Sequence, residues 1–401
     1  MLNLSIPEHI VPLRQKVLDF VEKEVYPVEK ALLDDKNGTG DKTRKTLGAL
    51  MQRAKDEGLW ALGHPEAIGG GGLPFMDYVF VNEVVGRSEV ANVALGTHSL
   101  QDSLMLHKYA SDKWREEYLR PLVDGEIFPS FGMTEPDVAS SDPTQLQTKA
   151  ELDGDEWVIN GRKWFTTHAG EAAYTTVMVR TETDVPDHSA FSMIVVPTDT
   201  RGYNIVRDVK VMGKPDGHYE VLYDNVRVPK TNLLGPRGQG FKIAQDRLGP
   251  GRIFHCMRWL GQAQRAFDLM CRRANKRVAF GKTLGEHQQI QKFISDTATE
   301  IQASRLLTLH AAQKIDEGDE ARIEIGLIKV YGATMLHNAI DRAIQVHGAL
   351  GVTEDTPLET MYRHARGARI LDGADEVHVM NSARRILRSY LDGGTFDFGL
   401  R

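Results

Sequence analysis

Near Ile127 the residue types and their spacing change, and this change limits the folds that the chain can adopt. From Ile127 to about Leu234, Val, Thr, Ile and aromatic residues recur at short intervals, as they do in β-strands. Asp153-Gly154 and Asn160-Gly161 are dipeptides that favour tight hairpin turns. Because no helical pattern separates the strand candidates, we expect an antiparallel β-domain rather than a βαβ unit. The strand candidates cover residues 156–159, 174–181, 191–197, 203–211 and 219–228.

Helical patterns flank the β-rich stretch on both sides. Ser5 and Glu8 have the spacing of a capping box, and apolar residues follow them at helical intervals. After Gly235, helical patterns cover residues 238–276, 284–316, 319–349 and 374–391. The sequence therefore predicts an α+β protein in three parts. These parts are an N-terminal helical domain over 1–126, a β-domain over 127–235 and a C-terminal helical domain over 236–401.

The composition excludes several classes of protein. A chain of 401 residues with 26% charged residues is long enough for two or three globular domains. It has no apolar stretch of the roughly 20 residues that a membrane span needs. Its 49 basic and 55 acidic residues give a net charge of −6, which disfavours nucleic-acid binding. Cys256 and Cys271 have no metal-ligand spacing, so we expect no zinc site, no disulfide framework and a reducing compartment.

The N-terminal segment lacks the pattern of a targeting sequence. Residues 8–34 are rich in Asp and Glu, whereas transit peptides are poor in acidic residues. The C-terminal residues Phe-Gly-Leu-Arg match neither a peroxisomal nor an endoplasmic-reticulum retention signal. We therefore expect a cytoplasmic protein.

Two segments of the β-rich part carry side chains suited to chemistry, although each also has a structural interpretation. Residues 131–142 are dense in hydroxyl groups, but they could equally form a polar connecting loop. Residues 163–167 place two adjacent aromatics before two threonines. Such a group could flank a flat heterocycle, and strand packing explains it as well.

Three further segments lie in the C-terminal part. Arg277, within residues 277–282, could meet a phosphate or could be a solvated arginine at a helix end. The glycines of residues 345–351 allow backbone amides to approach an anion, or they simply end a helix. Asp372 precedes the final helical pattern, where an acidic residue is usually an N-cap.

The order and spacing of these five segments together resemble the acyl-CoA dehydrogenase family, over nearly the whole chain. Met-Thr-Glu-Pro at 133–136, with Ser141-Asp142, is similar to the first signature of that family. The run from Gln345 to Asp372 is similar to the second signature. The resemblance implies a helical domain, a β-barrel-like domain and a C-terminal four-helix bundle. It also implies noncovalently bound FAD and a homodimer or homotetramer.

The resemblance assigns a set of residues to FAD. Met133 and Thr134 would contact the flavin ring, and Ser141 would contact the flavin pyrophosphate or the acyl-CoA. Phe165 and Thr167 occupy positions where family members stack a Trp on the flavin and bond it with a Thr. The resemblance places a further group against FAD held mainly by a neighbouring subunit: Arg277, Phe280, Gln288, Gln345, His347, Gly348 and Ala349. Ala374 and Glu376, at the start of the last helix, complete the expected cofactor contacts.

The resemblance also implies a catalytic base. Most family members carry Glu on the loop before the last helix, and a smaller group carries Asp, as this chain does at Asp372. A few members place the base on the first bundle helix, where this chain has Gly251. Asp372 is therefore the expected base, with Arg252 close to it. It would remove the α-proton of an acyl-CoA while hydride passes from Cβ to the flavin, which gives a trans-2-enoyl-CoA.

Three alternatives remain open from the sequence. A flavin oxidase of this fold, similar to nitroalkane oxidases, would also use an Asp base. A DNA-binding homologue would need a basic C-terminal surface, and Arg384, Arg385 and Arg388 form only a short cluster. An assembly factor without turnover would not need Asp372 and Arg252. We therefore expect an acyl-CoA dehydrogenase of fatty-acid β-oxidation that passes electrons to an electron-transferring flavoprotein.

Overall fold

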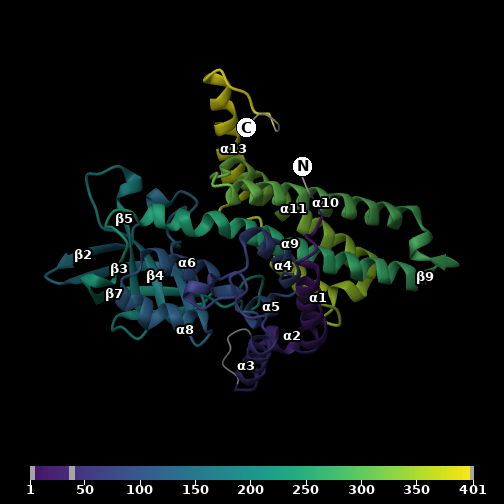
Figure 1. Ribbon diagram of the computed structural model, residues 1–401, viewed down its shortest axis with the longest axis horizontal. Helices are drawn as coiled ribbons and strands as arrows, with labels where there is room; N and C mark the ends of the chain where they lie inside the picture. The colour runs from purple at the N-terminus through teal and green to yellow at the C-terminus, as the bar shows by residue number, and fades with distance from the viewer. Residues whose placement is uncertain (1–4, 36–40, 398–401) are drawn as a thin grey trace. The chain divides into compact units, whose positions relative to one another are not determined.

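The chain folds into two compact units. The computed structural model describes residues 5–35 and 41–397. The sheet unit comprises residues 28–73 and 92–248, and the bundle unit comprises, as far as it is described, the residues up to 27, 74–91 and 249–401. The last of the boundaries between the two units, at residues 248 and 249, falls within the long helix α9 (Gly240–Lys276), which is labelled in Figure 1. The order helical, β, helical is confirmed, whereas the domain boundaries at 126 and 235 stay predictions.

The sheet unit is built on one eight-stranded sheet in the order β6-β7-β3-β2-β4-β5-β8, with β1 paired to β4. Most neighbouring strands are antiparallel, as expected, but β1 and β2 pair with β4 in parallel. The parallel pair β1–β4 is possible because the whole β2–β3 hairpin lies between these strands in the chain, and parallel strands need such a long connection. The strands are β1 (Phe128–Gly132), β2 (Lys149–Asp153), β3 (Glu156–Thr167), β4 (Ala172–Arg180), β5 (Phe191–Pro197), β6 (Tyr203–Asp208), β7 (His218–Pro229) and β8 (Leu233–Leu234).

The two predicted hairpin turns have different outcomes. Asp153 pairs with Glu156 across a tight turn in which Gly154 has a φ of 62°, so the first turn is confirmed. The second is wrong, because Asn160-Gly161 lies inside β3. There the register with β7 shifts at Gly161, whose φ is 149°. A Cβ at Gly161 would lie 2.5 Å from the hydroxyl oxygen of Thr148, the residue before β2, so close packing against that residue explains the glycine.

Two apolar cores stabilise the sheet unit. One packs helical residues such as Leu106 and Leu122 against strand residues such as Met178 and Phe191. The other is formed mainly by strand residues, including Trp157. The helices whose residues fall in this unit, entirely or in part, are α2 (Tyr26–Asp34), α3 (Asp41–Asp56), α5 (Glu89–Ala94), α6 (Leu100–Tyr109), α7 (Asp112–Trp114), α8 (Arg120–Val123) and the N-terminal part of α9.

The bundle unit is helical. Helix α11 packs against α10, α12 and α13, and α4 packs against α1 and α10. The long helices lie where their apolar periodicity predicts them. Helix α12 was not predicted from the sequence. The helices are α1 (Val11–Phe20), α4 (Phe75–Val85), the C-terminal part of α9, α10 (Gln288–Asp316), α11 (Arg322–His347), α12 (Leu358–Gly367) and α13 (Asp375–Leu391). A hairpin of β9 (Val278–Ala279) and β10 (Lys282–Thr283) joins α9 to α10 (Figure 1).

Candidate active site

In the sheet unit, the loop after β1 is bonded to strand β3. The Thr134 hydroxyl donates to the carbonyl of Trp164 at 2.7 Å, and the Trp164 N–H donates to the carbonyl of Thr134 at 3.0 Å. These two bonds fix Thr134 and its neighbour Met133 next to the segment 163–167 of β3, whose sequence made it a candidate for ligand binding. Ser141 lies farther along the same loop and is exposed.

A buried ion pair lies beneath this loop. Lys163 Nζ donates to Glu135 Oε1 at 2.8 Å and to the carbonyl of Met133 at 2.9 Å. The Glu135 carboxylate also accepts the N–H groups of Gln147 and Thr148, at 2.7 and 2.9 Å. Burial lowers the pKa of Lys163 to about 8. Burial alone would raise the pKa of Glu135, but the Lys163 cation and the hydrogen bonds outweigh it and lower that pKa.

Two predicted flavin contacts follow on the same strand. Phe165 has a left-handed φ of 49° and is 38% exposed. This conformation is rare for an aromatic residue, and it coincides with a shift in the β3–β7 register between Lys163 and Thr166. The Thr167 hydroxyl lies 2.9 Å from His218 Nδ1. Phe165 and Thr167 therefore lie on one irregular segment whose aromatic side chain is available to a flat ligand.

In the bundle unit, Asp372 lies on the loop between α12 and α13 with a left-handed φ of 53°. Two side chains donate to its backbone carbonyl: Arg252 Nε at 3.2 Å and His378 Nε2 at 3.1 Å. A third, His255 Nε2, lies 3.1 Å from its carboxylate oxygen Oδ2. Arg252 therefore holds the backbone of Asp372, and the carboxylate meets a histidine that sequence reasoning did not single out.

Burial also shapes the charges around Asp372. It lowers the pKa of Arg252, although the nearby Asp372 carboxylate acts in the opposite direction. It lowers the pKa of His378 as well, so this imidazole is neutral at neutral pH. The loop is tied down next to Asp372, where the buried Lys329 Nζ donates to Asp375 at 2.8 Å and Arg369 donates to the same carboxylate at 3.0 Å.

A tight hairpin carries the next group of predicted residues. Phe280 and Gly281, with φ of 54° and 82°, form the two-residue turn between β9 and β10. The side chain of Phe280 is 97% exposed. Arg277, just before β9, and Gln288, the first residue of α10, are also exposed. Along α9, Arg252 and the hairpin are separated by roughly 36 Å at 1.5 Å per residue.

The remaining predicted residues lie at two helix ends. Gln345 is exposed near the end of α11, and the exposed Gly348 and Ala349 follow it. His347 is buried, and its Nδ1–H donates to the carbonyl of Ala343 at 2.8 Å, so its imidazole has a structural partner. Ala374 is the N-cap residue of α13, and the exposed Glu376 lies in its first turn.

Three family models, for the N-terminal, middle and C-terminal domains of acyl-CoA dehydrogenases, match residues 7–126, 130–226 and 238–387. Together they span most of the chain. The chain belongs to the acyl-CoA dehydrogenase family. Family membership is consistent with an oxidoreductase that acts on a CH–CH group.

Individual relatives agree with this membership. The protein named probable acyl-CoA dehydrogenase FadE2 from Mycobacterium tuberculosis is 43% identical, and the match covers 96% of each chain. Acyl-CoA dehydrogenase family member 11 from Gallus gallus is 40% identical over 92% of this chain, which spans 49% of that relative's length. Among solved structures, a member from Mycobacterium abscessus has a TM-score of 0.91 at 38% identity, and the match covers 96% of this chain and 100% of the other. Butyryl-CoA dehydrogenase from Megasphaera elsdenii has a TM-score of 0.85 at 26% identity, with coverage of 96% and 100%.

Within this acyl-CoA dehydrogenase fold, the structure gathers the predicted residues into local groups. Met133, Thr134, Phe165 and Thr167 belong to one group in the sheet unit, whereas Arg252 and Asp372 belong to another in the bundle unit. The cofactor roles assigned to all of them stay predictions. Sequence reasoning missed Lys163 as the partner of Glu135, and it missed His255. The only local signal for His255 is its position one helical turn after Arg252.

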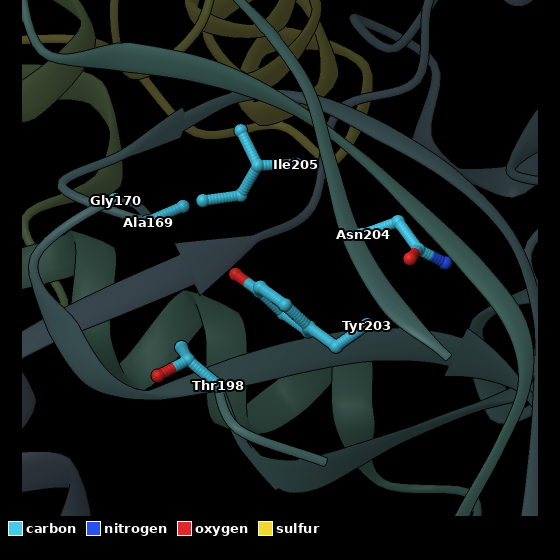
Figure 2. Close-up of a pocket in the computed structure, with 6 residues that line it drawn as sticks. All are labelled: Ala169, Gly170, Thr198, Tyr203, Asn204 and Ile205. Atoms are coloured by element: carbon cyan, nitrogen blue, oxygen red, sulfur yellow. The ribbon is translucent and has the colours of Figure 1, made fainter. Parts of the chain in front are cut away.

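A cavity of about 370 Å³ opens in the sheet unit, and Figure 2 shows its lining. Within it, Tyr203 shares a hydrogen bond of 2.8 Å with the Thr175 hydroxyl, and burial raises the pKa of this tyrosine to about 12. No residue predicted to bind FAD lines the cavity, so we assign it no function. Its lining residues are Ala169, Gly170, Thr198, Tyr203, Asn204 and Ile205.

Two further findings concern metals and membranes. Within residues 5–35 and 41–397, no group of three or more His, Cys, Asp or Glu side chains is arranged to hold a metal ion. In the same ranges, no helix combines the length and the apolar character that a membrane crossing requires.

Proposed function

We propose that this chain is an FAD-dependent acyl-CoA dehydrogenase in which Asp372 removes the α-proton of an acyl-CoA thioester to give the trans-2-enoyl-CoA. FAD, when bound, accepts the hydride from Cβ. The α-proton is very weakly acidic, so its removal needs a carboxylate held in place and hydrogen-bond donors to the thioester oxygen. The resemblance assigns one such donor to the backbone N–H of Asp372.

The observation that carries this proposal is the way in which Asp372 is held. A left-handed φ is costly for a residue other than glycine, and it persists only where the surroundings enforce it. Here Arg252 and His378 bond to the carbonyl of Asp372, and His255 contacts its carboxylate. The competing interpretation, an N-cap of the last helix, is unfavourable because the N-cap position of α13 is Ala374. A base is the role that best accounts for the strained backbone and the held carboxylate.

The residues of the chain also fit FAD. An exposed aromatic side chain at Phe165 is suited to a flavin ring, and an exposed guanidinium at Arg277 is suited to a phosphate. Phe280 is an almost fully exposed apolar side chain on a strained turn, which favours burial against a ligand or a second copy of the chain. Because roughly 36 Å of helix separates this hairpin from Arg252, we propose that the hairpin contacts FAD of a neighbouring subunit.

The expected partners follow from the family. Solved structures that resemble this chain include a glutaryl-CoA dehydrogenase in complex with glutaryl-CoA and butyryl-CoA dehydrogenase. We therefore propose acyl-CoA thioesters as substrates, an electron-transferring flavoprotein as the acceptor, and a homodimer or homotetramer as the assembly. A cytoplasmic location and a role in β-oxidation belong to the same proposal.

The first experiment tests the reaction itself. The purified flavoprotein is mixed anaerobically with butyryl-, octanoyl-, isobutyryl- or palmitoyl-CoA, and loss of the oxidised flavin absorbance is followed. We expect at least one acyl-CoA to reduce the flavin, and a ferrocenium dye to reoxidise it faster than O₂ does. Absence of reduction by every thioester in the panel would contradict the proposal, and fast oxidation by O₂ would favour an oxidase.

The second experiment tests the base. Asp372→Asn removes the proton acceptor, so the rate of flavin reduction should fall by at least about 10²–10⁴-fold while FAD and acyl-CoA still bind. Asp372→Glu keeps a carboxylate and should retain more activity than Asn. Asp355→Asn, at an exposed acidic residue of the loop before α12, is the matched control and should react normally. Near-normal flavin reduction in Asp372→Asn would exclude this residue as the base.

A further inference from the structure

On successive turns of α9, two side chains contact Asp372 and a third contacts one of these two. Arg252 donates to the Asp372 carbonyl, and His255 Nε2 lies 3.1 Å from the Asp372 carboxylate. Arg258 continues the series: its Nη2 lies 3.0 Å from His255 Nδ1. The result is a chain of contacts from Arg258 through the imidazole of His255 to the carboxylate.

The contact with Arg258 determines where the imidazole carries its proton. A guanidinium has only N–H donors and no acceptor, so His255 Nδ1 must accept a hydrogen bond from Arg258. The proton of the neutral ring is then on Nε2, and Nε2–H donates to the Asp372 carboxylate. A protonated ring would place an N–H and a positive charge against the guanidinium, which is unfavourable on both counts. Burial lowers the pKa of Arg258, but an arginine stays charged at neutral pH.

We propose that His255 is a positioning residue for the dehydrogenation: as a neutral Nε2–H donor, whose tautomer Arg258 fixes, it orients the Asp372 carboxylate toward the α-proton. This inference depends on the proposed role of Asp372 as the base. It assigns separate tasks to two residues of α9, because Arg252 fixes the backbone of Asp372 and His255 fixes its side chain.

A neutral donor suits a base better than a cation does. An arginine paired directly with the carboxylate would stabilise its charged form strongly and would make it a weaker base. A neutral imidazole restricts the rotation of the carboxylate with a smaller loss of basicity. Asp is also one methylene shorter than the Glu that most family members carry, so its reach depends more on a fixed orientation.

Other charged groups surround this arrangement and must be considered in any pH profile. Lys329 on α11 is paired with Asp375 on α13, so its charge is balanced locally. His378 on α13 donates to the Asp372 carbonyl and is neutral at neutral pH. The thiol of Cys256 is buried on α9, and burial raises its pKa, so it stays protonated near neutral pH. The titratable and charged side chains that interact with Asp372 are Arg252, His255, Cys256, Arg258, Lys329 and His378. Tyr78 on α4 and Glu89 on α5 act on the charge of Arg258.

The kinetic test compares two substitutions of His255 in the holoenzyme. His255→Leu removes the donor, and His255→Gln places an amide N–H near the position of Nε2. With the best acyl-CoA of the panel, we expect flavin reduction to slow by about 10–100-fold in the Leu variant, because misplacing a reacting group costs up to that much. The Gln variant should recover most of this loss. Equal rates in both variants, whether normal or slow, would overturn the inference.

The pH profile separates positioning from a merely structural effect. Loss of a donor to a carboxylate favours its protonated form, so the acidic limb of kcat/KM should move to higher pH in His255→Leu and stay near that of the wild type in His255→Gln. A slower Leu variant with an unchanged limb would indicate a packing defect only and would overturn the inference. FAD content and acyl-CoA binding, measured on the same samples, should be unchanged.

A spectroscopic test does not depend on turnover. In ¹H–¹⁵N spectra of the protein labelled with ¹⁵N-histidine, His255→Gln identifies the His255 signal. At pH 7.5 we expect a neutral ring with the proton on Nε2, and in Arg258→Met we expect a tautomer mixture that protonates more easily. A proton on Nδ1, or a protonated ring, in the wild type would overturn the inference.

The rates of flavin reduction distinguish failure of the base from failure of the positioning role. Fast flavin reduction in Asp372→Asn would reject the base itself. Slow reduction in Asp372→Asn together with a normal rate in His255→Leu would reject the positioning role alone.

Discussion

Lys163 Nζ lies 2.8 Å from Glu135 Oε1, and the two side chains are only 0% and 4% exposed. The same ammonium donates to the carbonyl of Met133, and the same carboxylate accepts the N–H groups of Gln147 and Thr148. One ion pair therefore joins strand β3, the loop after β1 and the segment that leads into β2. The loop predicted to contact the flavin takes its shape from this pair.

Removing one partner of the pair should destabilise the protein strongly. Lys163→Met leaves the Glu135 carboxylate buried without its cation, which typically costs about 3–5 kcal/mol. Denaturant unfolding at saturating FAD measures the loss. Lys149→Met is the matched control, because the Lys149–Glu151 pair is exposed at 59% and 72% and such pairs contribute at most about 1 kcal/mol. Similar small losses in both variants would contradict the importance of the buried pair.

Glu135 should also contribute to acid sensitivity. The pKa of Glu135 in the folded chain is lower than its ordinary value. The ionised carboxylate therefore stabilises the fold at any pH above its ordinary pKa. This contribution is lost as the pH falls through the pKa of the folded chain. We expect the denaturant midpoint of wild-type unfolding to decrease as the pH is lowered from about 5 to about 3. The midpoint of Glu135→Gln should start lower at pH 7 and fall less over this range. If the unfolding midpoint depends on pH equally in the two proteins, the acid sensitivity comes from groups other than Glu135.

Arg277 should contribute to FAD affinity without being needed for the fold. Its side chain is exposed, and loss of a hydrogen bond between a guanidinium and a phosphate costs on the order of 1.5–3 kcal/mol, or roughly 10–150-fold in affinity. FAD retention after dialysis is the measurement. Lys276→Ala, at the exposed neighbouring residue that ends α9, controls for general loss of positive charge. Full FAD content in Arg277→Ala would exclude the phosphate contact.

Phe280→Gly should separate stability from cofactor binding. The left-handed backbone of Phe280 costs about 1–2 kcal/mol in a residue other than glycine, and its side chain packs little within the chain. The variant should therefore unfold at the same or a higher temperature than the wild type when FAD is removed, yet bind FAD less tightly and assemble less stably. Val278→Ser, in the same hairpin and 59% exposed, should change FAD binding less. Normal FAD binding and assembly in Phe280→Gly would show that the aromatic side chain has no role in either.

The sequence by itself determined the features that depend on neighbouring residues. Apolar periodicity placed the long helices, the strand composition placed the sheet between them, and Asp153-Gly154 formed its turn, because helix and tight-turn preferences act over a few residues. The motifs around Met133 and Asp372 indicated the family for the same reason, since each is a short run of adjacent residues.

Only the tertiary structure decided which distant side chains meet. Asn160-Gly161 has a strong local turn preference, but close packing against Thr148 and pairing with β7 made it an irregularity inside β3. His255 and Asp372 are far apart in the chain, and no periodicity links them, so their 3.1 Å contact arises only when α9 packs beside the loop before α13. In the sequence, Lys163 is only one residue of a segment that could pack as a strand. Its charge stabilises the loop after β1 because burial removes water and leaves Glu135 as its counter-ion.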